Sequence, residues 1–243
     1  RPRPAHGDDA GSTHGRRHAV NQGHAVSAGI TVGKTVAVID YGMGNLRSVS
    51  QALEHVAGGR EIVVTADPAV VAAAERVVFP GQGAMPDCMR ELDARGLRPA
   101  VLAAARDKPF LGICIGLQML FEHSAEGDIA GLGVFAGEVK RFPDEKMVDR
   151  NGLRLKVPHM GWNRVQQKPH ALWEGIADGA RFYFVHSYCV QPADPSVVTG
   201  MTEYGIPFTC AVGRDNIFAV QFHPEKSAQD GLQLLKNFVE WRP

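Results

Sequence analysis

The chain has 243 residues, of which 44% are hydrophobic and 21% are charged, and its basic and acidic residues balance to a formal net charge of zero. This size and composition fit one globular α/β domain with a sizeable core. The neutral balance gives no electrostatic basis for partners such as nucleic acid or an anionic membrane, and no apolar run approaches the roughly 20 residues of a membrane span. The four cysteines lack zinc-type spacing, so we expect free thiols in a reducing, cytoplasmic location, with no metal and no cofactor.

Residues 1–33 differ from the rest of the chain, because they are rich in Arg, His, Gly, Ala and Ser and contain almost no large apolar side chain. Such a segment cannot bury enough surface to offset the entropy of ordering, so we predict a disordered extension or a non-native leader there. It also lacks the apolar stretch of a secretory signal. The folded unit is predicted to be a single domain that spans residues 34–243.

From residue 34 to residue 113, near-continuous apolar runs alternate with helical patterns. Such runs are typical of strands that are buried on both faces of a parallel sheet. Strands are predicted at 35–40, 61–65, 76–79 and 110–113, and helices at 46–56, 85–95 and 97–107.

From about residue 131 the pattern changes to short β-like segments that glycine and proline punctuate. Strands that alternate with helices and then give way to a run of strands predict an α/β fold. We expect a mostly parallel central sheet flanked by helices, with additional antiparallel strands in the C-terminal half. The later β-like segments are 134–142, 180–190, 197–204, 208–212 and 217–222, and a final helix is predicted at 228–241.

The strand predicted at 110–113 leads into Gly112-Ile113-Cys114-Ile115-Gly116. This glycine-x-nucleophile-x-glycine pattern is typical of a tight strand-to-helix turn that presents one reactive side chain. Backbone N–H groups at the start of the following helix favour the thiolate, the reactive form of a thiol that ordinarily titrates near ~8.5. A buried structural cysteine is the alternative interpretation of Cys114.

A thiolate nucleophile needs a base and a group that orients the base. The segment Gln221-Phe222-His223-Pro224-Glu225 follows the last predicted strand. Residues two apart in an extended segment point to the same side, so Glu225 can hold one ring nitrogen of His223 and leave the other for Cys114. A histidine beside a glutamate is also common on protein surfaces, but together with the elbow it predicts a Cys–His–Glu triad.

Attack on a carbonyl also needs donors for the developing oxyanion. The turn Pro80-Gly81-Gln82-Gly83 follows the strand predicted at 76–79, so we expect its tip at the carboxyl edge of the sheet, near the elbow. The backbone N–H of Gly81 or Gln82 and that of Ile115 are the expected donors. A plain strand-to-helix turn is the alternative interpretation.

Together, the elbow, the Pro-Gly-Gln-Gly turn and the Phe-His-Pro-Glu sequence resemble the class I (triad) glutamine amidotransferases, whose fold is flavodoxin-like. Segments 40–48, 158–163 and 183–188 are also similar to the glutaminase subunits of imidazole glycerol phosphate synthase. The resemblance covers residues 34–243 and leaves out the N-terminal extension. One departure is Gln82, where related chains often carry a small aliphatic residue.

The resemblance implies that Cys114 attacks the side-chain amide of L-glutamine, that His223 transfers the proton to the leaving ammonia, and that Glu225 orients His223. It implies a heterodimer with a (β/α)8-barrel cyclase subunit, through which ammonia passes to make imidazole glycerol phosphate and AICAR in histidine biosynthesis. Ordinary core or surface roles are the alternatives for each implied interface residue. The implied glutamine-binding residues are Gln118, Glu126, Ser187 and Tyr188, and the implied partner-interface residues are Trp162, Tyr183, His186 and Lys226.

Three other functions are possible for these motifs: a triad amidotransferase of nucleotide, folate or tryptophan metabolism, a cysteine peptidase or chaperone-like hydrolase, and a regulatory subunit without catalysis. Segments 40–48 and 158–163 argue against the first, and the Phe-His-Pro-Glu sequence argues against the second. The joint presence of the three triad residues argues against the third. The remaining cysteines, Cys88, Cys189 and Cys210, match no catalytic role.

Overall fold

The computed structural model describes residues 34–243, and the extension predicted for residues 1–33 lies outside the described residues. Among the described residues, no helix is long and apolar enough to cross a lipid bilayer. The helices are α1 (Leu46–Val56), α2 (Pro68–Ala73), α3 (Met85–Ala94), α4 (Arg98–Asp107), α5 (Ile115–Met119) and α6 (Ala228–Glu240).

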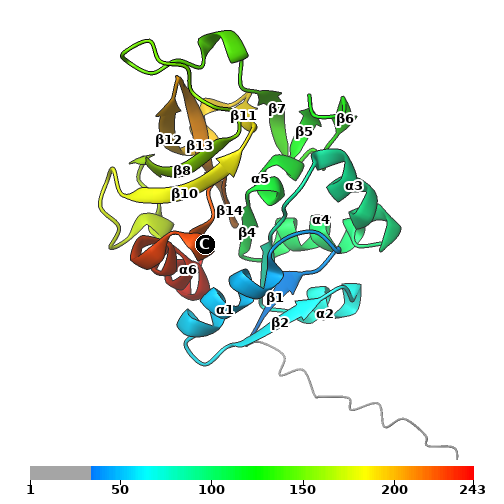
Figure 1. The fold of residues 1–243 in the computed structure, drawn as a ribbon. Coiled ribbons are helices and arrows are strands. Elements are labelled where there is room, and N and C mark those ends of the chain that lie inside the picture. The colour runs from blue at the N-terminus through cyan, green and yellow to red at the C-terminus, as the bar shows by residue number, and fades with distance from the viewer. Residues whose placement is uncertain (1–33) are drawn as a thin grey trace, which may run out of the picture.

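The first half of the chain builds the parallel part of the sheet, in the order β2-β1-β3-β4-β14. Four of these strands are buried along their whole length, which explains their continuous apolar sequences. Helices α1 and α6 pack together on one face, and α2 and α4 cover the other (Figure 1). These strands are β1 (Thr35–Ile39), β2 (Glu61–Thr65), β3 (Arg76–Phe79), β4 (Phe110–Ile113) and β14 (Ile217–Val220).

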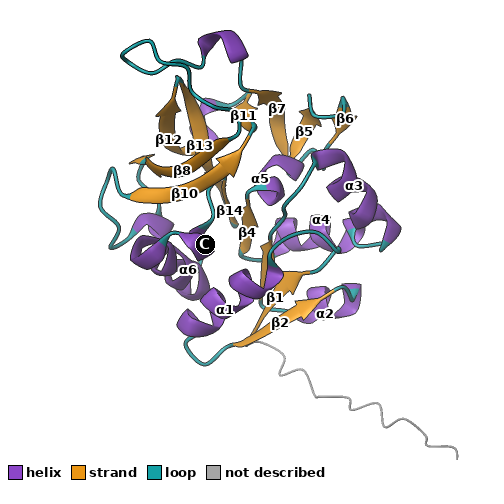
Figure 2. Cartoon of the chain, viewed as in Figure 1, coloured by secondary structure: helices purple, strands orange, loops and turns teal. Residues whose placement is uncertain are grey.

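The second half extends the sheet from β14 through antiparallel β13, β11 and β7, after which β5 pairs with β7 in parallel. A separate two-stranded ribbon of β8 and β10 lies beside them on the α6 side (Figure 2). The predicted α/β fold with added antiparallel strands is thus confirmed. The single strand predicted at 180–190 is wrong: it is two strands in different sheets, separated at Ser187. The later strands are β5 (Phe121–Ser124), β6 (Ile129–Ala130), β7 (Phe135–Arg141), β8 (His159–Arg164), β9 (Gln166–Gln167), β10 (Arg181–His186), β11 (Tyr188–Pro192), β12 (Val198–Tyr204) and β13 (Ile206–Arg214).

Strand register brings three distant segments to one edge of the sheet. Ile113 on β4 pairs with Val220 on β14, so the residues that follow them, Cys114 and Gln221, lie side by side. On the other side of β4, Phe79 of β3 pairs with Gly112, which places the turn after β3 against the elbow. All of these strands run parallel, so their carboxyl ends meet where ligands of such sheets bind.

Candidate active site

Cys114 lies on a sharp turn between β4 and α5. Its backbone has φ 55° and ψ −110°, a region that non-glycine residues rarely adopt, and its side chain is buried. The backbone N–H of Cys114 donates to the Val220 carbonyl at 2.8 Å, which ties the turn to β14. Helix α5 has only five residues, so the helix dipole at its N-terminus stabilises a thiolate less than the sequence pattern suggested.

The glycines around Cys114 are required by close packing. A methyl group on Gly116 would overlap the Phe79 carbonyl oxygen, and one on Gly112 would lie 3.0 Å from the Ala219 Cβ. A methyl on Gly81 would likewise overlap the Tyr41 hydroxyl and lie 3.1 Å from the Ile115 Cβ. The absence of side chains here lets β3, the elbow and the turn after β3 approach one another.

We expect Gly116→Ala to lower the free energy of unfolding by about 3 kcal/mol, because the added methyl must push β3 and α5 apart in a packed core. Urea unfolding of the two proteins measures this loss. Gly59→Ala is the matched control: Gly59 has φ 84° and nothing within 4 Å of an added Cβ, so it reports backbone strain alone. We expect a loss of only about 1 kcal/mol there, and equal losses in the two variants would contradict the overlap.

His223 and Glu225 form a buried pair at the same edge. The Nδ1 of His223 lies 2.8 Å from the Oε1 of Glu225, and the two side chains are only 4% and 1% exposed. The sequence pattern predicted an extended segment here, but only His223 is extended: Pro224–Lys226 form a 3-10 turn, and this turn brings Glu225 back to the ring. Because a carboxylate only accepts hydrogen bonds, Nδ1 carries the proton and Nε2 is the basic nitrogen of the neutral ring.

The charge around His223 favours its protonated form. Burial acts to lower the pKa of His223, but the charge of an ionised Cys114 sulfur and the Glu225 carboxylate outweigh burial and raise it to about 10. The Nε2 of His223 is buried and makes no hydrogen bond in this structure. The surroundings therefore favour an imidazolium beside the Cys114 sulfur.

A cavity of about 340 Å³ opens onto Cys114. Its wall includes both Gln82 and Ile115, whose backbone N–H groups were predicted as oxyanion donors, but it does not include Gly81, the other predicted donor. Each of the four residues predicted to bind glutamine also reaches this cavity, and they come from α5, the β5–β6 loop and the β10–β11 junction. Those residues are Gln118, Glu126, Ser187 and Tyr188.

Hydrogen bonds fix the polar groups of this cavity. The Oε2 of Glu126 accepts from the backbone N–H of Met85 at 2.8 Å, at the start of α3. The Nε2 of Gln118 donates to the Tyr188 carbonyl at 3.2 Å, while its Oε1 is buried and has no partner among residues 34–243. A buried acceptor with no partner is costly unless a ligand supplies a donor, so Gln118 is well placed to meet an N–H group of a bound molecule.

Two buried side chains form hydrogen bonds to backbone carbonyls of the turn Pro80–Gly83. The hydroxyl of Tyr41 donates to the Pro80 carbonyl at 2.9 Å, and the thiol of Cys88 donates to the Gln82 carbonyl at 3.7 Å. Both side chains are fully buried, and burial raises the pKa of Cys88 to about 11, so the thiol stays protonated. Cys88, which matched no role in the sequence, thus supports the backbone of the predicted oxyanion turn.

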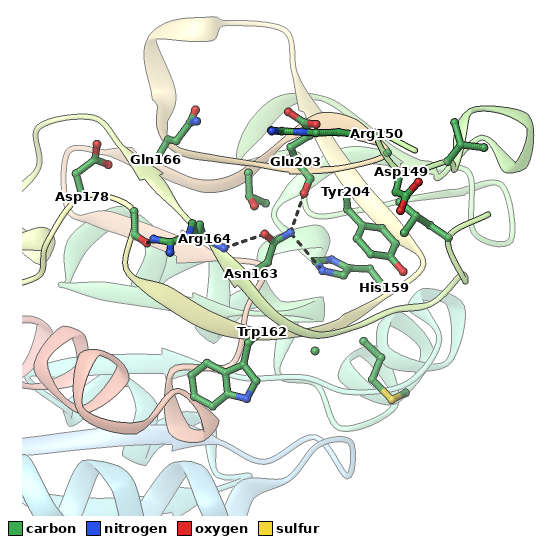
Figure 3. Close-up of a pocket in the computed structure, with 17 residues that line it drawn as sticks. Asp149, Arg150, His159, Trp162, Asn163, Arg164, Gln166, Asp178, Glu203 and Tyr204 are labelled. Carbon is green, nitrogen blue, oxygen red and sulfur yellow. Dashed lines mark hydrogen bonds between the residues drawn. The ribbon is translucent and has the colours of Figure 1, made fainter. Parts of the chain in front are cut away.

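The residues predicted at a partner interface fall into two groups. Trp162 is 50% exposed and packs edge-on against Tyr183 across the β8–β10 ribbon, with 6.1 Å between ring centroids. Figure 3 shows the Trp162 side chain pointing away from Asn163 and His159. Lys226 is half-buried beside Glu225. His186 is only 6% exposed and lies on the wall of the cavity that opens onto Cys114, here called the inner cavity.

Two polar side chains at the site were not singled out from the sequence. The Nε2 of Gln221 donates to the Cys114 sulfur at 3.7 Å, and His159 lies 3.0 Å from the buried His186, between ring nitrogens. Gln221 is the first residue after β14, next to the elbow in the register, and this adjacency is the signal that could have identified it. The His159 contact depends on the pairing of β8 with β10, a strand that was not predicted.

Comparison with known proteins agrees with this geometry. The family model for class-I glutamine amidotransferases matches residues 37–241. Two crystal structures of glutamine amidotransferases share the fold. One gives a TM-score of 0.63 at 18% identity, with 84% of this chain and 97% of that chain covered. The other, from Thermotoga maritima, gives 0.52 at 17% identity, with 81% and 78% covered.

Curated relatives are much closer in sequence. The imidazole glycerol phosphate synthase subunit HisH of Dechloromonas aromatica is 83% identical over 211 residues, which cover 87% of this chain and 98% of the relative. The subunit of the same name from Aromatoleum aromaticum is 70% identical over 209 residues, with 86% and 99% covered. The chain therefore belongs to the class-I glutamine amidotransferase family and, within it, to the HisH subunits of imidazole glycerol phosphate synthase.

Proposed function

We propose that this chain hydrolyses L-glutamine with Cys114 as nucleophile, His223 as base and acid, and Glu225 as the group that orients His223. The observation that supports this most directly is the position of the Cys114 sulfur. It lies on a strained turn at the mouth of a cavity, beside a buried imidazole–carboxylate pair. The same arrangement in other hydrolases generates a nucleophile and recovers its proton for the leaving group.

The reaction begins when the thiolate attacks the side-chain carbonyl carbon of glutamine. The carbonyl oxygen becomes an oxyanion, for which the N–H groups of Ile115 and of Gln82 or Gly81 are the candidate donors. The imidazolium Nε2–H of His223 then protonates the departing nitrogen, so ammonia leaves and a thioester remains on the sulfur. Water, activated by the neutral ring, hydrolyses the thioester to glutamate and regenerates the thiolate.

The cavity offers groups that match the α-amino acid end of glutamine. Glu126 brings an anionic oxygen that can meet the substrate ammonium, and Gln118 has an unpartnered amide oxygen. The backbone around Ser187 and Tyr188 completes the wall where β10 gives way to β11. These contacts would hold the substrate with its amide at the sulfur.

The partner of the proposed reaction is a (β/α)8-barrel cyclase subunit, as in imidazole glycerol phosphate synthase, for histidine biosynthesis. In bulk water near neutral pH, ammonia is mostly protonated and cannot act as a nucleophile, so a closed passage between subunits keeps it reactive. The exposed apolar side chains of Met160 and Trp162, with Tyr183 beside them, supply a surface for this partner. The cysteines described by the structure are all free and buried, which fits a reducing cytoplasm.

Reconstitution with the barrel subunit tests this function. The complex with its nucleotide substrate bound should form glutamate from glutamine, and the isolated chain should do so more slowly, because we propose that the partner reorganises the Pro80–Gly83 turn. A glutamine-mimicking diazo-ketone should label Cys114 and stop the reaction. No glutamate from the complex would refute the function, whereas equal turnover with and without the partner would refute only the coupling.

A further inference from the structure

Gln221 is a buried polar residue next to the Cys114 sulfur, and the proposed reaction gives it no role so far. It is fully buried, and its backbone N–H donates to the Cys210 carbonyl at 2.8 Å, so its position after β14 is fixed. Its side-chain Nε2 lies 3.7 Å from the Cys114 sulfur, and its Oε1 lies 3.1 Å from the Nε2 of Gln118. A buried amide next to a nucleophile can either donate or accept, and the chemical effect on the sulfur is opposite in the two cases.

The orientation of this amide is determined by a fixed acceptor in the cavity wall. The Tyr188 backbone carbonyl can only accept, so the Gln118 group that faces it at 3.2 Å must be the NH2. That same NH2 reaches Gln221, which must therefore present its oxygen to Gln118. The NH2 of Gln221 is then left to face the Cys114 sulfur. Amide orientations are assigned from such networks, and here the network permits one assignment.

A second chain of hydrogen bonds reaches the Tyr188 carbonyl from another cavity, here called the outer cavity, whose lining includes Trp162, Asn163 and Tyr204. Asn163 lies at the floor of that cavity and faces both the Glu203 carbonyl and the His159 ring (Figure 3). His186 must donate from Nδ1 to the Tyr188 carbonyl at 2.7 Å, so its Nε2 accepts from the Nδ1 of His159. The Tyr188 carbonyl therefore accepts two hydrogen bonds, one from Gln118 and one from His186.

We propose that Gln221 is a further catalytic residue, whose side-chain amide donates a hydrogen bond to the Cys114 sulfur and stabilises the thiolate before glutamine binds. This role rests on the proposed glutamine hydrolysis. An N–H donor to an anionic acceptor forms a stronger hydrogen bond than one between neutral groups, so it favours the thiolate over the thiol. The role is chemically needed here, because the five-residue helix α5 provides little field of its own.

The pH dependence of Cys114 alkylation tests this role directly. Iodoacetamide reacts with the thiolate, and mass spectrometry of the Cys114 peptide follows one site. The other thiols do not compete, because burial raises the pKa of Cys88 to about 11 and that of Cys189 to about 12. We expect Gln221→Met, which removes the donor but keeps the volume, to raise the midpoint of the profile by about one pH unit. At a pH below both midpoints, the rate should fall about tenfold.

Two further variants make the result specific. Gln221→Glu still accepts from Gln118 but places an anion beside the sulfur, so its midpoint should rise further than that of Gln221→Met. Thr202→Val alters a buried polar side chain that lines the outer cavity and should leave the midpoint unchanged. If Gln221→Met does not fold, Gln221→Leu removes the same donor without adding a charge and gives the same readout.

An unshifted midpoint in a folded Gln221 variant would overturn the role. Alkylation needs neither glutamine nor the partner, so that outcome is separate from a failure of the wild-type complex to form glutamate. In the reconstituted complex, a donor to the sulfur should affect kcat more than the glutamine KM. A loss confined to KM would instead indicate a substrate contact and would also overturn the proposal.

Discussion

Replacing Glu225 by glutamine should lower the rate of glutamate formation by about a thousandfold in the reconstituted complex at saturating glutamine. The change is nearly isosteric, and it occurs at a side chain that is only 1% exposed and 2.8 Å from the ring of His223. It removes the charge that helps to raise the pKa of His223 to about 10. If the new NH2 faces the ring, Nδ1 must accept and the proton moves to Nε2, which then cannot take a proton from the thiol.

A double-variant comparison separates this catalytic effect from general damage. Groups that act as a unit lose activity together, so Glu225→Gln combined with His223→Gln should be no slower than His223→Gln alone. The glutamine KM should change little, because neither residue lines the cavity. A Glu225→Gln enzyme within tenfold of the wild-type rate would show that the carboxylate does not support the base.

The parallel half of the fold could be predicted from sequence because its signals are local. The runs at 61–65, 76–79 and 110–113 coincide with β2, β3 and β4. Strands β3 and β4 are buried on both faces and so read as unbroken apolar segments between turns, and the edge strand β2 was recognised from its β-branched run Ile62–Thr65. Strand β8 has no such signal: Met160 and Trp162 are exposed along it, and glycine separates them. The break at Ser187 could not be predicted either. Strands β10 and β11 follow one another as one β-like segment, and they differ in their partner strands, which are β8 for β10 and β7 for β11.

The candidate site shows the same division. Cys114, His223 and Glu225 were predicted as a group because each lies next to a strand end with a recognisable turn, and their roles remain proposals. The orientation of Gln221 could not be predicted, since it depends on a network that joins α5, β11 and β14. His186 was assigned to the partner surface by resemblance, whereas its hydrogen bonds to His159 and the Tyr188 carbonyl place it on the inner wall.

The buried pair of His159 and His186 should make stability depend steeply on pH below neutrality. Burial lowers the pKa of His159 to about 4 and that of His186 to about 3, because aromatic rings surround both imidazoles and each ring faces the other. In the unfolded chain, a histidine titrates near ~6.5. Between pH 6.5 and 4 the unfolded state therefore binds protons that the folded state does not bind, so the free energy of unfolding falls as the pH falls through this window.

The triad histidine acts with the opposite sign and in a different window. The pKa of His223 is raised in the folded state, so its contribution is fully present below about pH 6.5 and is lost only as the pH rises toward 10. It therefore adds no slope between pH 6.5 and 5, where the buried pair acts together with His170, whose pKa burial also lowers. The two effects together place the stability maximum near neutral pH.

Urea unfolding at pH 6.5 and pH 5 should accordingly differ by at least about 3 kcal/mol, since His159 and His186 each contribute up to about 1.4 kcal/mol per pH unit and His170 adds to the same slope. His159→Gln keeps a polar side chain at the position but removes one titrating ring, so it should remove roughly 1.5 kcal/mol of the difference. His55→Gln changes an exposed histidine on α1 and should leave the difference intact. Equal stability at the two pH values would mean that the folded protein accepts a proton on this pair. The free site is the Nε2 of His159, so the NH2 of Asn163 that faces it at 3.4 Å would have to turn away.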